Sequence, residues 1–470
     1  MYQLSIDTFI NHQIANRQIV NKMMNWKQLI SAKRFGMEEF HEERQENRSE
    51  FQRDYDRLIF SAPFRRLQNK TQVFPLPGSV FVHNRLTHSL EVASVGRSLG
   101  DDVAKALLER HPELQDSFLP EIGSIVSAAC LAHDLGNPPF GHSGEKAIST
   151  FFSEGKGVRL KEKQPNGEQL SPMEWEDLTH FEGNANAFRI LTHQFEGRRK
   201  GGFVLTYTTL ASIVKYPFSS SLAGTKSKFG FFVSEEESFQ KIATELGLTL
   251  LNEHPLKYAR HPLVYLVEAA DDICYQMMDI EDAYKLKILT TEETKELLMT
   301  YFSEERQEHL RKTFLIVNDV NEQIAYLRSS VIGLLIRECT RVFLDHEQEI
   351  LSGTFEGSLI KRIAERPAAA YKHSVEVSIN KIYRSRDVLD IELAGFRIIS
   401  TLLELMIDAV TSPEKAYSKL LIDRVSSQYN INSPVLYERI QAVLDYISGM
   451  TDVFALDLYR KINGNSLPAV

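Results

Sequence analysis

The sequence has few cysteines, and this scarcity excludes two kinds of site. Its 470 residues include only three, Cys130, Cys274 and Cys339, and no two of them have a paired spacing. We therefore expect neither a disulfide framework nor a thiolate metal site, and we expect a protein of the reducing cytoplasm.

Long apolar runs and an excess of positive charge are also lacking. We find no uninterrupted apolar stretch of membrane-spanning length, and no charged start followed by a short apolar core and a cleavage site, so we expect no membrane partner. The formal net charge is −9, which disfavours nucleic-acid binding by bulk charge. A local basic pocket can still attract an anionic substrate, because such a substrate responds to the local field.

Alternating strands joined by hairpin turns are lacking as well, whereas helical periodicity is frequent. Apolar side chains recur at helical spacing over residues 122–130 and again over 264–275. Residues 320–350 and 392–410 form longer periodic stretches. Hydrophobic residues make up 43% and charged residues 25% of the chain, an ordinary globular balance. The sequence therefore predicts an all-α fold, a helical core with an additional C-terminal helical region.

Breaks in the pattern predict three parts. Residues 153–172 are rich in Lys, Glu, Gly and Pro, and residues 217–235 carry Ser, Gly and Lys, which indicates surface excursions. A polar stretch at about 290–312 separates two helical halves. We therefore predict an N-terminal extension and entry helix at 1–48, a catalytic core at 49–290 and a C-terminal helical region at 291–470 whose long helices are compatible with oligomer contacts.

The most informative segment is Ala132–Glu145. It puts His133 and Asp134 at the end of an apolar run, continues with a Gly/Pro-rich loop, and ends with His142 three residues before Glu145. Imidazole and carboxylate are ligands that suit a catalytic divalent metal, and a His one turn from a carboxylate is typical of an oriented acid or base. The alternative is a plain helix start in which Glu145 is a favourable first-turn acid.

A second segment, Asn84–Ser89, is expected to open a helix capped by Asn84 or Thr87. His88 in its first turn can then coordinate a metal while Arg85 meets an anion. The alternative is a surface His beside a solvated Arg.

A third segment puts Glu268, Asp271, Tyr275 and Asp279 on one helical face. Carboxylates on an otherwise apolar helix are costly unless they bind a cation or accept hydrogen bonds. The alternative is an acidic face that is simply wet. Asp272 points elsewhere and is a natural control.

Together these segments provide two imidazoles and two carboxylates, from His88, His133, Asp134 and Asp271. Zinc prefers nitrogen and sulfur ligands, whereas a mixed set suits Mn²⁺, Fe²⁺, Mg²⁺ or a borderline Zn²⁺ with open positions. Residue types alone leave the choice of metal open.

The same residues lie in strings that resemble the HD-domain phosphohydrolases, and most closely their deoxyguanosinetriphosphate triphosphohydrolases (dGTPases) and related dNTP triphosphohydrolases. The C-terminal part matches more loosely, through Lys381–Tyr383 and the helix at 392–395. Six matching segments run in order over about residues 49–285: Phe64–Pro75, Arg85–Ser89, Ala132–His142, Phe181–Ala185, Lys215–Pro217 and Glu268–Tyr275.

This resemblance implies a role for each residue. His88, His133, Asp134 and Asp271 would bind Mg²⁺ or Mn²⁺, with Fe²⁺, Ni²⁺ and Zn²⁺ also compatible. His142 would be the catalytic acid, oriented by Glu145. The substrate contacts implied by the resemblance are Gln72, Arg85, His180, Lys215, Lys228, Tyr275 and Asp279.

The implied reaction converts a dNTP, with dGTP preferred, into a deoxynucleoside and tripolyphosphate. Water activated by the metal would attack the α-phosphorus while His142 protonates the departing 5′-oxygen. The loop from Leu135 to Gly141 would set the distance between these two functions. Implied partners are further copies of the chain, as a hexamer or other dimer-based oligomer, a dNTP activator at a second site, and single-stranded DNA.

Two other interpretations stay open. One is another HD phosphohydrolase, such as a nucleotidase or a cyclic-nucleotide phosphodiesterase. The other is an HD protein that senses dNTPs or binds single-stranded nucleic acid with little turnover. Gln72, Lys215, Tyr275 and Asp279 favour a triphosphate substrate, because a phosphomonoesterase does not need a triphosphate cradle.

Overall fold

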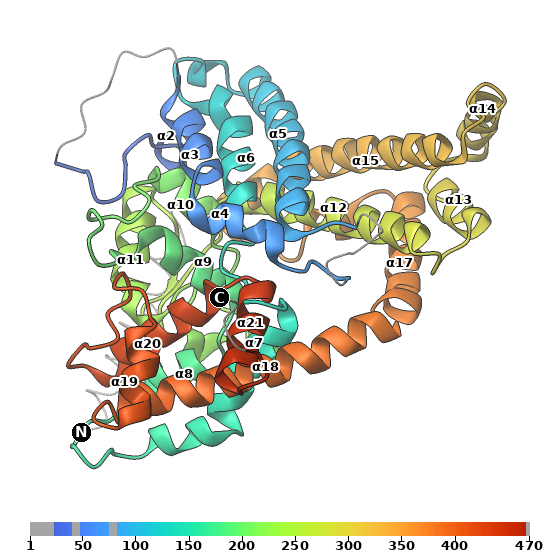
Figure 1. The fold of residues 1–470 in the computed structure, drawn as a ribbon. Helices are drawn as coiled ribbons and strands as arrows, with labels where there is room; N and C mark the ends of the chain where they lie inside the picture. Colours follow the sequence, from blue (N-terminus) through green and yellow to red (C-terminus); the bar gives the residue numbers. More distant parts are fainter. Residues whose placement is uncertain (1–22, 40–47, 75–81, 467–470) are drawn as a thin grey trace, which may run out of the picture.

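The protein is almost entirely helical in a computed structural model that describes residues 23–39, 48–74 and 82–466 (Figure 1). This confirms the predicted all-α class. Of the predicted N-terminal part, 1–48, only residues 23–39 and 48 lie within the described ranges, and the three domain boundaries stay predictions. None of the helices described in these ranges is long and apolar enough to cross a membrane.

The N-terminal half, taken up to residue 285, contains mostly short helices and two long ones, at Arg85–Arg110 and Val264–Lys285. The predicted excursions at 153–172 and 217–235 carry mainly 3-10 turns, such as Lys156–Lys161 and Ser220–Leu222. The α-helices of this half are α2 (Trp26–Leu29), α3 (Glu50–Ile59), α4 (Ala62–Arg66), α5 (Arg85–Arg110), α6 (Ile122–Ala132), α7 (His142–Ser153), α8 (Pro172–Thr179), α9 (Gly183–Thr192), α10 (Tyr207–Ile213), α11 (Glu236–Glu245) and α12 (Val264–Lys285).

The second half includes the two long helices that the periodicity predicted, and the polar stretch at 290–312 forms α13 and part of α14. Its α-helices are α13 (Thr291–Met299), α14 (Glu304–Phe314), α15 (Val320–Asp345), α16 (Glu347–Ser352), α17 (Glu365–Val377), α18 (Arg386–Thr411), α19 (Ala416–Asp423), α20 (Leu436–Ser448) and α21 (Asp452–Ile462). Figure 1 shows α15 reaching out towards α13 and α14, while α18 returns to α19, α20 and α21.

One small sheet was not expected from the sequence. Strands β1 (Leu250–Asn252) and β2 (Lys257–Tyr258) pair antiparallel, with Leu250 opposite Tyr258. Strands this short contain too few residues for an alternating pattern to stand out.

Helices α5, α6 and α12 pack together at the centre of the molecule. The predicted start of α5 is correct: the Asn84 side chain accepts from the Thr87 amide, and Thr87 in turn accepts from the Asn84 amide, which forms a capping box. Ten of the eleven residues of α6 are buried, which explains its mainly apolar sequence. These three helices bring the predicted metal ligands together.

Two apolar clusters divide the interior. The first contains α5, α6, α10, α12 and α15, together with Leu135 just after α6. The second joins α7 and α8 to α18, α20 and α21, and Phe140 packs against it. The segment from Leu135 to Phe140 therefore crosses from one cluster to the other.

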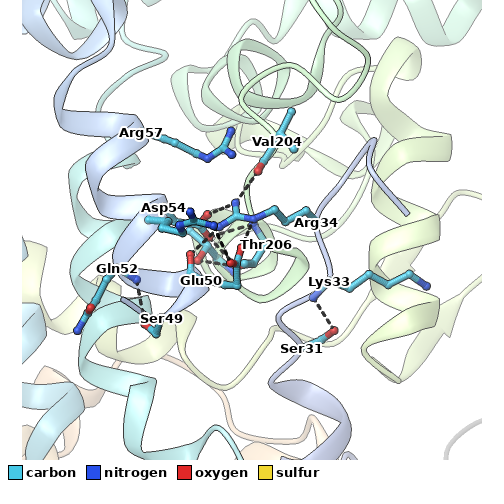
Figure 2. Close-up of polar contacts among 12 residues, drawn as sticks. Ser31, Lys33, Arg34, Ser49, Glu50, Gln52, Asp54, Arg57, Val204 and Thr206 are labelled. Atoms are coloured by element: carbon cyan, nitrogen blue, oxygen red, sulfur yellow. Dashed lines mark hydrogen bonds and ion pairs between the residues drawn. The ribbon is translucent and has the colours of Figure 1, made fainter. Parts of the chain in front are cut away.

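A buried ion network fastens the chain near its described beginning to the first cluster. Figure 2 shows Arg34 between α3 and the segment around Thr206. Arg34 is 3% exposed and donates to Asp54 Oδ1 at 2.7 Å and to the Val204 carbonyl at 2.7 Å, while Asp54 Oδ2 accepts from the Thr206 amide at 2.9 Å. Removing one partner of such a buried pair typically costs about 3–5 kcal/mol.

A second buried pair holds the start of α5 against α12. The His83 amide and ring Nδ1 both contact the Asp282 carboxylate at 2.8 Å, and His83 Nε2 lies 3.3 Å from Glu91 Oε1. Burial disfavours a charge on His83, but the hydrogen bonds to Asp282 and Glu91 outweigh it and raise the pKa of His83 from 6.5 to about 9.

The His83 pair predicts a pH-dependent contribution to stability. Because the folded pKa is raised, the contribution is fully present below about pH 6.5 and is lost as the pH rises through 9. We expect His83→Gln to lower the free energy of unfolding by roughly 3 kcal/mol at most at pH 6 and by much less at pH 10, measured by urea denaturation. His346→Gln, at a more exposed His, is the control. An effect of His83→Gln that is the same at both pH values would contradict the assignment.

Candidate metal centre and active site

Two neighbouring cavities lie where the three central helices meet α7. One, of about 240 Å³, is lined by residues of α5, α10 and α12 and of the segment after α6. The other, of about 290 Å³, is bounded by α7 and α18. They share the lining residues Gln72, His142 and Tyr275. Ligand pockets usually measure about 300–1,000 Å³, so the joined pair is suited to a ligand larger than either cavity alone would hold.

The first cavity contains a cluster that could hold a metal ion. One ligand atom each from His88, His133 and Asp134 lie within 4.8 Å of one another. The Nδ1 atom of His133 lies 2.6 Å from the Cys130 carbonyl, so Nδ1 carries a proton and Nε2 is the ring nitrogen that could bind a metal ion. That Nε2 atom is buried without a hydrogen-bond partner. A buried, unpartnered imidazole nitrogen oriented by a carbonyl fits a metal ligand.

Asp271 completes the predicted ligand set. Its Oδ1 atom lies 3.1 Å from His88 Nε2 and 3.5 Å from His133 Nε2. Its side chain is 34% exposed, compared with 1% for His88 and 12% for His133. The structure thus brings all four predicted ligands together, with Asp271 on the open side of the cluster.

The electrostatics of this cluster favour positive charge. Burial opposes a charge on His133, but the carboxylates of Asp134 and Asp271 outweigh it and raise its pKa to about 9. Burial raises the pKa of each of these carboxyl groups, but cationic neighbours, chiefly Arg85 for Asp134 and His133 for Asp271, lower both pKa values overall. Arg85 Nη1 donates to Asp134 Oδ2 at 2.8 Å, and the side-chain Nδ2 of Asn137 donates to Oδ1. Asp134 is therefore fixed in orientation from two sides.

His142 and Glu145 line the first cavity beside the cluster, in the first turn of α7. The contacts of the described residues contain no hydrogen bond between them. Glu145 Oε1 accepts instead from the Gly183 amide at 2.9 Å, and His142 is exposed. Both residues thus reach the predicted site, while the predicted orientation of His142 by Glu145 stays a prediction.

Each cation predicted to contact phosphate has a carboxylate partner in the cavity wall. Arg85 pairs with Asp134, as described above. Lys215 Nζ lies 3.2 Å from Glu268 Oε1, and Lys228 Nζ lies 2.5 Å from Glu182 Oε1. Burial disfavours the charge on both lysines, but the paired glutamates outweigh it and raise their pKa values.

Gln72 and Tyr275 stand at the junction of the two cavities. Gln72 Oε1 is buried and has no hydrogen-bond partner. The Tyr275 ring lies edge-on to His88, at 6.4 Å between centroids, and beside Tyr383 at 6.1 Å. A buried acceptor without a hydrogen-bond partner, next to an aromatic ring, suits a ligand whose ring carries hydroxyl groups.

Asp279 and His180 lie off the cavity walls. Asp279 is 3% exposed and accepts from the Tyr383 hydroxyl at 2.5 Å, so Tyr383 stands between it and the second cavity. His180 ends α8 and lies 3.1 Å from Glu176 Oε2. Their predicted contacts to substrate stay predictions.

Several residues that line the first cavity lie within the segments that resemble the dGTPases, but we predicted no role for them. Asn137, Glu182, Asn184 and Tyr216 are the clearest cases. Asn137 follows the His-Asp pair by three residues, a spacing that could have indicated its bond to Asp134. The other three acquire their positions only through long-range packing.

Comparison with known proteins agrees with this geometry. The family model of the HD domain matches residues 85–198, which include all the predicted ligands except Asp271, and that of the phosphohydrolase-associated domain matches residues 363–461. These matches define the chain as an HD-domain protein.

Similar proteins with a known description place the chain in a narrower family than the HD-domain proteins as a whole. The chain is 38% identical to a deoxyguanosinetriphosphate triphosphohydrolase-like protein of Synechocystis, over 94% of this chain and 100% of the relative. A protein of the same description from Pseudomonas aeruginosa is 37% identical over 95% and 100%. The deoxyguanosinetriphosphate triphosphohydrolase of Yersinia enterocolitica is 30% identical over 93% and 99%. The chain belongs to the deoxyguanosinetriphosphate triphosphohydrolase-like family.

The cluster geometry predicts that Asp271 contributes to cation affinity whereas its neighbour Asp272 does not. We expect Asp271→Asn to weaken Mn²⁺ binding by roughly tenfold or more, because even residues that only orient a metal ligand contribute 10- to 100-fold. Asp272→Asn should bind Mn²⁺ like the wild type. The measurement is isothermal titration calorimetry, and equal affinities for the two variants would exclude Asp271 from the site.

Proposed function

We propose that the protein hydrolyses dNTPs, with dGTP preferred, to a deoxynucleoside and tripolyphosphate. One observation carries the proposal: a single cavity combines an imidazole–carboxylate cluster, three cationic side chains and a buried, unpartnered amide oxygen. Each of these groups suits a different part of a nucleoside triphosphate. The family membership supports the same reaction.

The donor set fits a divalent cation, Mg²⁺ or Mn²⁺ in our proposal, with Fe²⁺, Ni²⁺ and Zn²⁺ also compatible. His88, His133, Asp134 and Asp271 would hold it. When bound, such a cation lowers the pKa of water and offsets negative charge on phosphate. The buried Nε2 atom of His133 would then have a partner.

Arg85, Lys215 and Lys228 would bind the triphosphate. Their carboxylate partners keep the cavity from carrying a large uncompensated charge when it has no anion in it. A triphosphate brings several negative oxygens and competes with those partners for the same N–H donors. Charge on the transferring phosphoryl group is therefore stabilised by groups that are already in position.

Gln72 and Tyr275 would select the sugar. Gln72 Oε1 can accept a hydrogen bond from a deoxyribose hydroxyl, while the Tyr275 ring packs against the ring face and leaves no room for a 2′-hydroxyl. Asp279, whose predicted partner is the 3′-hydroxyl, would reach the second cavity through the Tyr383 hydroxyl.

His142 would donate a proton to the departing 5′-oxygen. It lies on the wall shared by both cavities, between the cluster and the region proposed for the nucleoside. Glu145 lies in the same wall and would orient the imidazole. The further predictions, His180 as a phosphate contact, a homo-oligomer, a dNTP activator, single-stranded DNA binding and a cytoplasmic location, stay predictions.

The proposed reaction predicts specific products. With Mg²⁺ or Mn²⁺, incubation with each dNTP should release the deoxynucleoside and intact tripolyphosphate, resolved by ion-exchange chromatography and ³¹P NMR, with dGTP the fastest substrate. Pyrophosphate plus dNMP, or single phosphates, would favour another phosphohydrolase. Tight binding of dNTPs without turnover under any metal would favour a sensor.

The sugar-selecting role predicts a change of specificity in Tyr275→Ala. We expect the ratio of kcat/KM for dGTP to that for GTP to fall by roughly 10- to 100-fold, because the side chain that blocks a 2′-hydroxyl is removed. Tyr284→Ala, on the same helix but outside the cavity, should keep the wild-type ratio. A wild-type protein that hydrolyses GTP as fast as dGTP would refute the role.

A further inference from the structure

The segment from Leu135 to Gly141, which we call the catalytic loop because it precedes His142, joins two separately packed parts of the molecule. Leu135 belongs to the apolar cluster that contains the metal ligands, whereas Phe140 packs against the cluster of α7 and α18. The distance from His133 to His142 is therefore not fixed by either cluster alone. A further contact is needed to fix the position of one cluster relative to the other.

The backbone immediately before His142 is in an unfavourable conformation. Phe140 has a φ of +62° and Gly141 a φ of +56°. A left-handed conformation costs a residue with a side chain about 1–2 kcal/mol, so Phe140 needs a compensating interaction. A Cβ at position 141 would also lie 2.4 Å from an Arg85 guanidinium nitrogen, which leaves only glycine there. His142 is thus directed by a strained two-residue turn.

The carboxylate of Asp452 supplies that interaction. Its Oδ1 accepts from the Phe140 amide at 2.9 Å, and its Oδ2 accepts from the Thr71 amide at 2.8 Å. Thr71 immediately precedes Gln72. One side chain, 6% exposed and at the start of α21, therefore holds both segments that bring a polar group to the junction of the cavities.

Further contacts surround the same turn. The Lys70 ammonium, 2% exposed, donates to the Asn137 carbonyl at 2.5 Å and to the Ser448 carbonyl at 2.8 Å. On α18, a Cβ at Gly395 would lie 2.5 Å from Phe140 Cβ, so this helix packs directly beneath the turn. Three separate contacts thus join the C-terminal region to the catalytic loop.

We propose that Asp452 is a positioning residue that sets His142 and Gln72 relative to the metal ligands. This inference rests on the proposed function for the roles of those two residues. A carboxylate is needed because each of its oxygens accepts from a different amide. An asparagine would present an NH₂ group to one of these N–H donors and leave that amide unsatisfied.

A simpler role for Asp452 is a first-turn acid that stabilises α21, typically by 0.3–1 kcal/mol. The two roles predict different outcomes for Asp452→Asn. Loss of helix stabilisation alone lowers the melting temperature and leaves the catalytic loop in place. Loss of positioning releases two distant segments together.

Hydrogen–deuterium exchange tests the positioning without any assay of activity. In Asp452→Asn we expect exchange to become roughly tenfold faster in peptides covering 135–144 and 70–74, with little change in α5 or α12. Asp457→Asn, on the exposed side of the same helix, is the control. Unchanged exchange in both peptides would overturn the proposal, whatever reaction the protein catalyses.

A double-mutant cycle tests the link to chemistry. We expect Asp452→Asn to lower kcat for dGTP by roughly 10- to 100-fold and to leave Mn²⁺ affinity within about twofold of the wild type. In a His142→Ala background the same substitution should cost clearly less, because one of the two groups it positions is already absent and only the displacement of Gln72 still counts. Fully additive losses, or loss of Mn²⁺ binding, would assign Asp452 a general structural role instead. A wild-type protein without dNTP turnover would refute the proposed function and leave the exchange test in force.

Discussion

Two carboxylates that face two buried imidazoles set the constraint on which the rest of this structure depends. Asp134 carries negative charge where little water reaches, with Asp271 on the open side of the same cluster, and buried charge persists only when it is compensated. Arg85 and Asn137 compensate Asp134, while the His133 Nε2 atom stays buried without a hydrogen-bond partner. In our proposal a divalent cation completes this arrangement. Helices α5, α6 and α12 must therefore meet with little freedom, and the capped start of α5 and the buried length of α6 serve that requirement.

The position of the proposed proton donor obeys a separate constraint. His142 belongs to α7, which packs with the C-terminal helices, so its position relative to the cation ligands depends on contacts across the boundary between the two clusters. Asp452 provides such a contact at Phe140, and Lys70 provides another at Asn137. In our proposal the phosphohydrolase-associated region, residues 363–461, therefore takes part in shaping the active site even though it contributes none of the proposed metal ligands.

Local signals explain what could be predicted from the sequence. The all-α class, the capped start of α5 and the long C-terminal helices follow from periodicity and capping residues, and the four proposed ligands lie in short segments with unusual polarity. Long-range packing explains the rest. Tyr383 covers Asp279 from 104 residues away, and Asp452 contacts Phe140 across 312 residues. No local pattern predicts such pairs. The strand pair β1–β2 was not predicted because its strands, of three and two residues, are too short to show an alternating pattern.

The most direct test of the account is a crystal structure with Mn²⁺ and a non-hydrolysable dGTP analogue, with the metal located by its anomalous scattering. The account predicts one Mn²⁺ bound by His88, His133, Asp134 and Asp271 next to the α-phosphorus, with His142 within hydrogen-bonding distance of the 5′-oxygen. A metal bound elsewhere, or an analogue whose γ-phosphorus lies next to the metal with the α-phosphorus remote, would contradict it.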